Sequence, residues 1–376
     1  MIDFQKLPSP CFVLDEQLLD RNLAVIDRVR RESGAEVIVA LKACAMWSIF
    51  PELAQHSDGA TASSLAEARL VFEEFGRPAH TYAPVYTDRN IEEILDCSDH
   101  ITFNSVAQFE RFGQMALLRG ISCGLRINPG YSPVETDLYN PCVPGSRLGI
   151  PAGELKELPA GVEGLHFHVL CESRPEHLRL ALDAVEKRFG RFLDRIKWLN
   201  MGGGHLMTHK DYDCDELIRI LQEFKAKYPN LRLILEPGSA FTWRTGYLVS
   251  TVEDIVENGG VRTAMLDVSF ACHMPDCLEM PYKPAILGAR DPEPGEKGWR
   301  MGGNSCLAGD YYGDWIFDRD LRVGDRIVFE DMIHYAMVKT TMFNGVAHPA
   351  IAIVRRDGAI EIIREFGYED FKSRMS

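Results

Sequence analysis

Short apolar runs alternate with amphipathic segments along most of the chain before residue 246. Val37–Leu41 is a continuous apolar run, which is typical of a strand buried on both faces of a parallel sheet. Ser64 and Glu67 have the spacing of a capping box and open an amphipathic helix that ends at Phe75, just before Gly76. Further strands are predicted at Gly59–Ala62, Thr81–Pro84, Ile101–Phe103, Cys123–Ile127, Val162–Val169, Ile196–Met201 and Leu231–Leu235.

Helical periodicity separates most of these strands. The pattern predicts about eight strands that alternate with helices, which is the number in an α/β fold of the (β/α)₈ or TIM barrel type. No sequence repeat supports this assignment, so it depends on the rhythm alone. Residues 129–151 are rich in Pro and Gly and are expected to form a long loop over the barrel mouth. The helical patterns lie at Asn90–Cys97, Val106–Arg119, Pro175–Asp194 and Asp213–Tyr228.

The pattern changes after Gly246, where turn signals punctuate shorter alternating segments. Asn258-Gly259-Gly260 and Asp357-Gly358 are two of these turns. We therefore predict a barrel in residues 25–245 and a β-barrel or β-sandwich domain in residues 1–24 and 246–376, with Phe12–Leu14 as a candidate strand of it. Its other expected strands are Tyr247–Val256, Val261–Val268, Arg326–Phe329, Ala350–Val354 and Ala359–Arg364.

Composition restricts the partners of this 376-residue chain. Its net charge of −14 argues against general nucleic-acid binding, which needs a basic face, but is compatible with a cationic substrate. No apolar stretch approaches the roughly 20 residues that cross a bilayer, and the N-terminal residues lack the pattern of a signal peptide. The ten cysteines form no C-x-x-C pair, so we expect free thiols and a cytoplasmic protein without membrane association.

Candidate site residues follow the predicted barrel strands, where barrels of this kind build their active sites. Lys42 directly follows the first strand, and partial desolvation there makes an amine nucleophilic. Gly202-Gly203-Gly204 follows the seventh strand and allows backbone N–H groups to approach a phosphate. Glu236 ends the eighth and needs a positive partner, such as a protonated pyridine nitrogen. The plainer alternatives are a surface lysine, a flexible turn and a structural ion pair.

Histidines raise the question of a metal site. His166 and His168 project to one face of the sixth strand, and His205 and His209 have i, i+4 spacing. No acidic or cysteine cluster completes the first pair, and the second lacks the glutamate of H-E-x-x-H. We therefore expect no metal, and we assign His168 to stacking on a planar cofactor.

Taken in order along the chain, these residues resemble the alanine-racemase-like group of pyridoxal-phosphate enzymes, especially the ornithine and diaminopimelate decarboxylase branch. The resemblance covers essentially the whole chain. It implies that Lys42 holds pyridoxal 5′-phosphate, that His168 stacks on its ring and that the triple glycine binds its phosphate. It also implies that Glu236 pairs with the pyridine nitrogen.

The same resemblance gives roles to residues of the β domain. Cys306 falls in a loop that completes the active site of the neighbouring subunit, with Asp310 nearby. A homodimer with shared active sites is thereby implied. Tyr335 falls on a tyrosine that contacts the cofactor phosphate, and Phe343-Asn344-Gly345 matches the stretch that follows it.

Three departures separate the chain from ornithine and diaminopimelate decarboxylases. Ser239 stands directly after Glu-Pro-Gly, where those enzymes have arginine. Val169-Leu170-Cys171-Glu172 replaces their Gly-Ser pair after the histidine, and Leu307 replaces the glutamate of diaminopimelate decarboxylase. This set resembles the carboxynorspermidine decarboxylases, also described as carboxyspermidine decarboxylases. That family makes norspermidine or spermidine from carboxylated precursors.

The resemblance implies that the chain releases carbon dioxide from a cationic, carboxylated polyamine. The expected catalytic residues are Lys42 and Cys306, either of which could return a proton to the substrate carbon. The expected substrate ligands are Glu236, His273, Asp276 and Asp310.

Several alternatives stay open at this stage. Carboxynorspermidine and carboxyspermidine differ by one methylene, which a hydrophobic pocket discriminates by only about 1–3 kcal/mol. The chain could instead decarboxylate diaminopimelate, ornithine or arginine. A racemase and a non-catalytic cofactor carrier are further alternatives. Glu236 weighs against a racemase, and the β domain weighs against a carrier.

Overall fold

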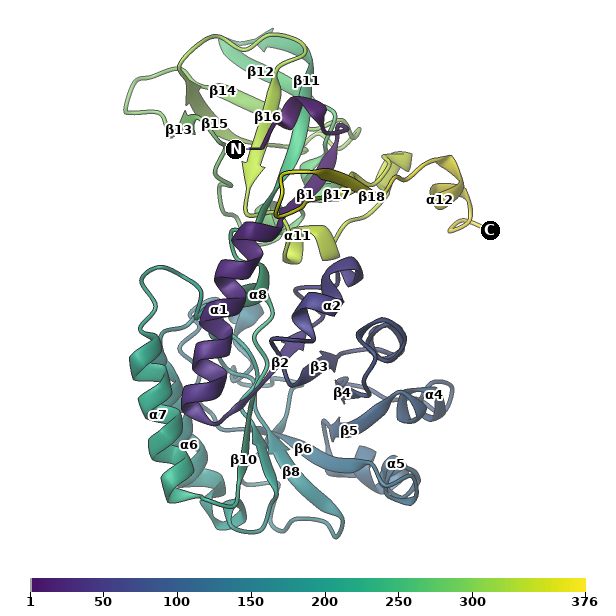
Figure 1. Ribbon diagram of the computed structural model, residues 1–376, viewed down its shortest axis with the longest axis vertical. Helices are drawn as coiled ribbons and strands as arrows, with labels where there is room; N and C mark the ends of the chain where they lie inside the picture. Colours follow the sequence, from purple (N-terminus) through teal and green to yellow (C-terminus); the bar gives the residue numbers. More distant parts are fainter. Residues whose placement is uncertain (1) are drawn as a thin grey trace. The chain divides into compact units, whose positions relative to one another are not determined.

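The computed structural model describes residues 2–376 and divides into two compact units (Figure 1). The barrel unit contains Asn22–Phe241. The sheet unit contains the residues up to Arg21 together with Thr242–Ser376. The chain therefore starts in the sheet unit, passes through the whole barrel unit and returns.

Parallel strands in the barrel unit form a closed barrel, in which β5 pairs with β6 to complete the ring. The predicted barrel fold is confirmed, and every expected strand has its counterpart. These strands are rich in apolar residues because both of their faces are covered. A short β7 (Ile150–Pro151) adds to β6 outside the ring. The barrel strands are β2 (Glu36–Ala40), β3 (Gly59–Ala62), β4 (Ala79–Tyr82), β5 (Ser98–Phe103), β6 (Ser122–Asn128), β8 (Val162–His166), β9 (Trp198–Asn200) and β10 (Arg232–Leu235).

Helices lie outside the barrel strands, as Figure 1 shows for α4, α5, α6 and α7. Ser64 caps the predicted helix, because its Oγ accepts from Glu67 N at 3.2 Å. Glu67 Oε2 accepts from Ser63 N at 2.6 Å rather than from the N–H of Ser64, so the second bond of the expected capping box is displaced by one residue. This helix continues through a π-helical turn to Phe75 and ends at Gly76, whose φ of 72° suits glycine. The helices are α1 (Glu16–Ser33), α2 (Phe50–Leu53), α3 (Leu65–Leu70), α4 (Ile91–Asp96), α5 (Val106–Leu118), α6 (Pro175–Leu193), α7 (Cys214–Lys227) and α8 (Ser239–Thr242).

Trp198 fills the middle of the barrel. Its ring packs in a cluster with Ile38 and Ile234. Two neighbouring strands carry glycine where they face the ring: a Cβ on Gly124 would lie 2.2 Å from it, and one on Gly164 would lie 2.0 Å from it. The indole Nε1 donates to Ser122 Oγ at 2.9 Å, which satisfies its buried N–H. The barrel is thus a packed core in its middle layer rather than a pore.

The sheet unit is built on a mixed sheet in the order β13-β15-β14-β12-β11-β1-β17-β18, with β16 paired to β11. Asn258-Gly259-Gly260 joins β11 to β12, and Asp357-Gly358 joins β17 to β18, at the predicted turns. The strands are β1 (Cys11–Asp15), β11 (Gly246–Asn258), β12 (Val261–Leu266), β13 (Ala289–Arg290), β14 (Trp299–Gly302), β15 (Tyr311–Phe317), β16 (Arg326–Glu330), β17 (Ala350–Val354) and β18 (Ile360–Arg364). Three short helices lie between them, α9 (Phe270–His273), α10 (Asp276–Glu279) and α11 (Tyr335–Val338), and α12 (Tyr368–Lys372) follows β18.

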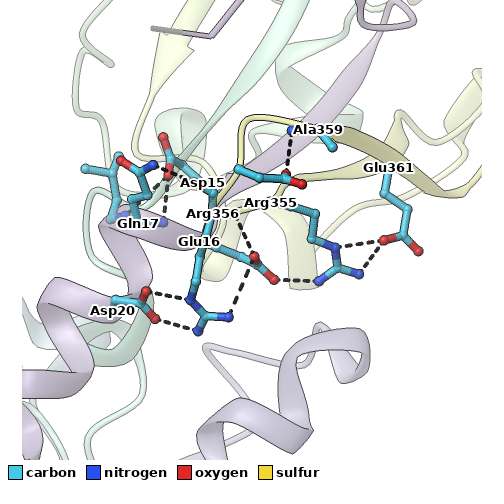
Figure 2. A network of polar contacts seen from close by, with 10 residues as sticks. Asp15, Glu16, Gln17, Asp20, Arg355, Arg356, Ala359 and Glu361 are labelled. Atoms are coloured by element: carbon cyan, nitrogen blue, oxygen red, sulfur yellow. Dashed lines mark hydrogen bonds and ion pairs between the residues drawn. The ribbon is translucent and has the colours of Figure 1, made fainter.

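An ion-pair network fastens the start of α1 to the turn between β17 and β18 (Figure 2). Glu16 Oε1 accepts from Arg355 Nη1 at 2.5 Å, and Oε2 accepts from Arg356 N at 3.0 Å. The Arg356 guanidinium makes two 2.7 Å hydrogen bonds to Asp20. Glu16 is buried, and these hydrogen bonds give its carboxylate oxygens the partners that a buried polar group needs.

Among the described residues, no helix combines the length and apolar character needed to cross a membrane. The ten cysteines are all free thiols.

The contact between Trp198 and Gly164 generates a prediction about stability. Gly164→Ala should lower the free energy of unfolding by about 1–3 kcal/mol, because the added methyl overpacks the barrel core. Gly190→Ala is the matched control: it lies in α6 with open space around the new Cβ, and should raise stability by about 0.5–1 kcal/mol. Urea denaturation followed by circular dichroism measures both. Equal midpoints for Gly164→Ala and the unmodified protein would contradict the packing.

Candidate active site

Lys42 lies in the turn that directly follows β2, at the carboxyl end of the barrel. Its Nζ is 3.1 Å from His168 Nε2. Burial lowers the pKa of the Lys42 ammonium; the negative charge of Glu236 opposes the shift and Arg126 adds to it. A lysine with a lowered pKa supplies the neutral amine that attacks a carbonyl group.

His168 connects Lys42 to the glycine loop. Its Nδ1 accepts from the backbone N–H of Gly203 at 2.9 Å, so the neutral ring carries its proton on Nε2, which faces Lys42. Burial lowers the pKa of His168 well below its usual value, and the charges of Lys42 and Arg126 lower it further. Arg126 Nη2 also donates to the His168 carbonyl at 3.2 Å. The ring is therefore a neutral, oriented plane.

The triple glycine after β9 has no room for side chains. A Cβ on Gly203 would lie 2.3 Å from Glu236 O, and a Cβ on Gly204, where φ is +93°, would lie 2.3 Å from Leu170 O. The N–H groups of Gly202 and Gly203 already donate, to Asn200 Oδ1 and His168 Nδ1 at 2.9 Å. The glycines therefore provide a close-packed cradle, and an anion here would be contacted from Gly204 onward rather than by all three residues.

Glu236 is the acidic group of the site. Asn200 Nδ2 donates to its Oε1 at 2.6 Å, and His166 Nε2 lies 3.7 Å from its Oε2. Burial opposes the charged form, but His166 and the hydrogen bond from Asn200 outweigh it, and the pKa falls to about 2. Glu236 is thus ionised at neutral pH. Such a carboxylate suits a protonated ring nitrogen as its partner.

His166, Asn200, Arg126 and Tyr82 complete the interior of the site. Arg126 lies over the Tyr82 ring, 4.7 Å from its centroid, and the Tyr82 and His166 rings are 5.2 Å apart. His166 is buried, and within residues 2–376 neither of its ring nitrogens has a hydrogen-bond partner. The sequence placed Arg126 and His166 at the ends of the fifth and sixth strands, on the face where the site was expected, but gave none of these four residues a specific role in binding or catalysis. Asn200 and Arg126 could have been given one, because both lie toward the carboxyl ends of barrel strands.

In the sheet unit, Asp310 organises the loop that carries Cys306. Its carboxylate accepts from Ala271 N at 3.0 Å and from Ser305 Oγ at 2.6 Å. Cys306 is exposed, and its backbone N–H donates to Asn344 Oδ1 at 2.9 Å. The thiol is therefore presented to solvent by a loop that is fixed at two points.

The remaining expected residues also lie in the sheet unit. His273 is fully buried; Ser269 N donates to its Nδ1, and its Nε2 faces Ala347 O, each at 3.1 Å. Neither nitrogen is left for a substrate, so we remove His273 from the expected ligands. Asp276 forms an ion pair with Lys339, and Tyr335 begins α11.

The structure brings Lys42, His168, the triple glycine and Glu236 together at one end of the barrel. Together they fit pyridoxal phosphate: an amine of lowered pKa, a flat neutral ring, a cradle that any Cβ would fill and an ionised carboxylate.

Comparisons with known proteins agree with this geometry. Residues 11–333 match the family described as "Pyridoxal-dependent decarboxylase, C-terminal sheet domain". The carboxyaminopropylagmatine decarboxylase of Synechocystis is 54% identical over 370 residues, covering 98% of this chain and 96% of the relative. The carboxynorspermidine/carboxyspermidine decarboxylase of Campylobacter jejuni is 39% identical over 383 residues, covering 99% of each.

A solved structure gives the same result at the level of the fold. The crystal structure of carboxynorspermidine decarboxylase from Campylobacter jejuni, complexed with norspermidine, has a TM-score of 0.90 and 38% identity. The match covers 98% of this chain and 100% of that one. The chain therefore belongs to the pyridoxal-dependent decarboxylase family, and it is a carboxy-lyase.

Proposed function

We propose that this protein uses pyridoxal phosphate held on Lys42 to decarboxylate a carboxylated polyamine, releasing the polyamine and carbon dioxide. The observation that carries the proposal is the full-length similarity, at 38–39% identity, to carboxynorspermidine/carboxyspermidine decarboxylases, one of them solved with norspermidine. Ser239, which stands where diaminopimelate and ornithine decarboxylases have arginine, distinguishes this chain from both of those enzymes.

Four residues of the barrel unit would hold the cofactor. Lys42 would bind it covalently, His168 would lie against its ring, and Gly204 would contact its phosphate. Glu236 would pair with its ring nitrogen. Bound in this way, the cofactor supplies a positively charged ring that accepts the electron pair released when the carboxylate leaves.

The residues around the site then have defined tasks. Glu236 keeps its negative charge because Asn200 donates to it, and this charge favours a protonated partner. His168 Nε2 orients the Lys42 amine. Loss of carbon dioxide must be followed by return of one proton to the same carbon, so that the product gains hydrogen where the substrate had carboxylate. We assign that proton to Cys306 of a partner subunit or to Lys42.

The contacts of the distal amines belong to the sheet unit in this proposal. Asp310 and Asp276 are the acidic residues that we retain as ligands. Asp276 shares Lys339 with Glu279, so a cationic substrate would compete with that lysine for the Asp276 carboxylate. Asp310 is more restricted, because backbone and hydroxyl donors already bind its oxygens.

A second candidate substrate is carboxyaminopropylagmatine, and the 54% identity to the Synechocystis enzyme favours it. It ends in a guanidinium group, whereas carboxynorspermidine and carboxyspermidine end in an ammonium group. A guanidinium makes paired, planar hydrogen bonds to a carboxylate, so a site built for it discriminates against an ammonium. The two candidates share the same decarboxylation chemistry and differ only in this distal group.

The substrate is tested by measuring carbon dioxide release from five compounds: carboxynorspermidine, carboxyspermidine, carboxyaminopropylagmatine, diaminopimelate and ornithine. We expect kcat/KM to be at least about 10²-fold higher for the carboxylated polyamines than for diaminopimelate or ornithine, because buried polar groups that lose their partners penalise the wrong ligand. The order of kcat/KM among the first three compounds shows whether the site prefers a distal ammonium or a distal guanidinium. Preferential turnover of diaminopimelate would refute the polyamine proposal while leaving the family assignment intact.

The role of Glu236 gives a second prediction. Glu236→Gln should lower kcat by about 10²-fold or more, because it removes a preorganised charge where charge develops during the reaction. Glu163→Gln is the control, because Glu163 lies on the barrel strand β8 but accepts hydrogen bonds from Lys197 and Ser122 instead. Steady-state kinetics and the absorption spectrum of the bound cofactor should be recorded together. A cofactor-loaded Glu236→Gln enzyme with unchanged kcat would contradict this role.

The shared dimer site gives a third prediction. Lys42→Ala and Cys306→Ala chains should each be inactive or nearly so alone. Mixed after dissociation and reassociation, they should recover about a quarter of the unmodified activity, because half of the dimers are hybrids with one intact site in two. Dimers in which both subunits carry Lys42→Ala provide the baseline activity. Absence of any recovery, with hybrid formation verified by native mass spectrometry, would rule out a site shared in this way.

A further inference from the structure

A second polar cluster lies near the amino end of the barrel strands, where β2 begins with Glu36, rather than at the end that carries Lys42. It consists of His80 on β4 and of Asp99 and His100 on β5. The three possible ligand atoms lie within 4.8 Å of one another. Within the described residues 2–376, no other trio of His, Cys, Asp or Glu satisfies this geometry.

The two imidazoles and the carboxylate converge on one point. His100 Nδ1 is 2.7 Å from Asp99 Oδ1, and His80 Nε2 is 3.8 Å from the same oxygen. The two rings stack with their centroids 4.0 Å apart and their planes inclined by 23°. One nitrogen of each ring therefore lies near the same carboxylate oxygen.

A β-bulge makes this convergence possible. Ala79 pairs with Ser98 and His80 pairs with His100, so the register passes over Asp99. In a regular strand, Asp99 and His100 would point to opposite faces of the sheet. A bulge inserts one unpaired residue and re-aims its side chain, and such bulges are frequent next to functional sites. This irregularity brings Asp99 to the side on which His80 and His100 meet.

The protonation states suit a cation. Burial and the neighbouring His100 lower the pKa of His80 to about 4, so its imidazole is neutral at pH 7. Burial opposes the ionisation of Asp99, but its hydrogen bond with His100 outweighs this and lowers the pKa of the carboxyl group. Glu36 also carries a charge nearby and is held by two 2.8 Å hydrogen bonds from Arg232.

We propose that His80, Asp99 and His100 bind one divalent transition-metal ion, with Zn²⁺ as the preferred ion. Two imidazoles and one carboxylate are a common ligand set for such ions, and a water molecule would fill the fourth position of a tetrahedral Zn²⁺ site. The half-exposed Asp99 gives the ion access from solvent, while the two histidines lie beneath with small exposed fractions. The bound ion ties β4 to β5.

The site lies toward the opposite end of the barrel strands from Lys42, although His80 and Glu236 each influence the pKa of the other. The packed layer of Trp198, Ile38 and Ile234 lies in the barrel interior, and His100 contacts the Trp198 ring edge-on with centroids 5.7 Å apart. The bound ion stabilises the barrel, because a ligand that binds only the folded state adds its binding free energy to folding. This stabilisation can be measured without reference to turnover.

The test uses the tag-free, cofactor-loaded enzyme after treatment with a chelator. Isothermal titration with ZnCl₂ should reveal one site per chain, and Zn²⁺ should raise the melting temperature. Asp99→Asn, which keeps the shape of the side chain but removes its charge, should weaken binding at least about 10-fold, and His100→Ala should abolish it. His56→Ala is the matched control: His56 Nδ1 is 2.7 Å from Asp27 Oδ2 but belongs to no such trio, so Zn²⁺ binding should not change.

A spectroscopic readout locates the ion. Co²⁺ bound at this site should quench part of the tryptophan fluorescence through Trp198, and Asp99→Asn should reduce that quenching at equal Co²⁺ concentration. If His100→Ala fails to fold, Asp99→Asn and His56→Ala still decide the question. Absence of a saturable Zn²⁺ site in the unmodified enzyme, or equal affinity in Asp99→Asn and His56→Ala, would overturn the proposal.

Discussion

An ionised carboxylate inside a protein is costly unless charges and hydrogen-bond donors surround it, and the upper layer of this barrel is arranged around such a group, Glu236. Asn200 meets one of its oxygens and His166 lies near the other. Asn200 in turn accepts from the N–H of Gly202, so the same amide that supports the carboxylate also fixes the start of the glycine loop. Asn200 therefore links Glu236 directly to the glycine loop.

The two ends of the barrel are chemically different, and the middle keeps them apart. At the carboxyl end lie Lys42, His168 and Glu236, whose charges depend on one another. The Trp198 ring fills the middle, and two strands have glycine where they face it, at Gly124 and Gly164. One large residue thus replaces the several medium-sized ones that usually fill such a layer. The two ends are still coupled electrostatically, because Glu236 and His80 each influence the pKa of the other.

The sequence supported the prediction of the barrel because its signals are local. Apolar runs mark strands that are covered on both faces, and the rule that sites follow the strands was enough to group Lys42, the triple glycine and Glu236 in one site. Two kinds of feature could not be read in this way. The short strands β13 and β14 lie in a region of Pro, Gly and charged residues, where tertiary pairing overrides weak propensity. The strand β15 was also missed, although its aromatic residues favour a strand. The long helix α1 was also missed, since residues 1–24 were assigned to the β domain as a whole.

Site residues were missed where their role depends on long-range geometry. The sequence marked His166 only as a possible metal ligand, yet its ring lies beside Glu236, which is distant in sequence. His80 and His100 carry no motif, because a register shift between two strands is what brings them to Asp99. His273 was expected to contact the substrate because it lies in an acidic segment suited to a cation, but backbone groups satisfy both of its nitrogens. Strand-pairing register and backbone contacts exist only in the folded chain, so the sequence pattern does not reveal these roles.

The position of β1 has a consequence for the order in which the protein forms during synthesis. β1 is made first, but its two neighbours, β11 and β17, are made after the entire barrel. On the ribosome, Cys11–Asp15 therefore leaves the exit tunnel as an unpaired apolar strand, while the barrel can close as soon as β10 has emerged. Domains generally fold as units during translation, so here an inserted domain is complete before the domain that contains it. β1 therefore lacks its first strand partner until β11 is made, and its second until Ala350–Val354 is made.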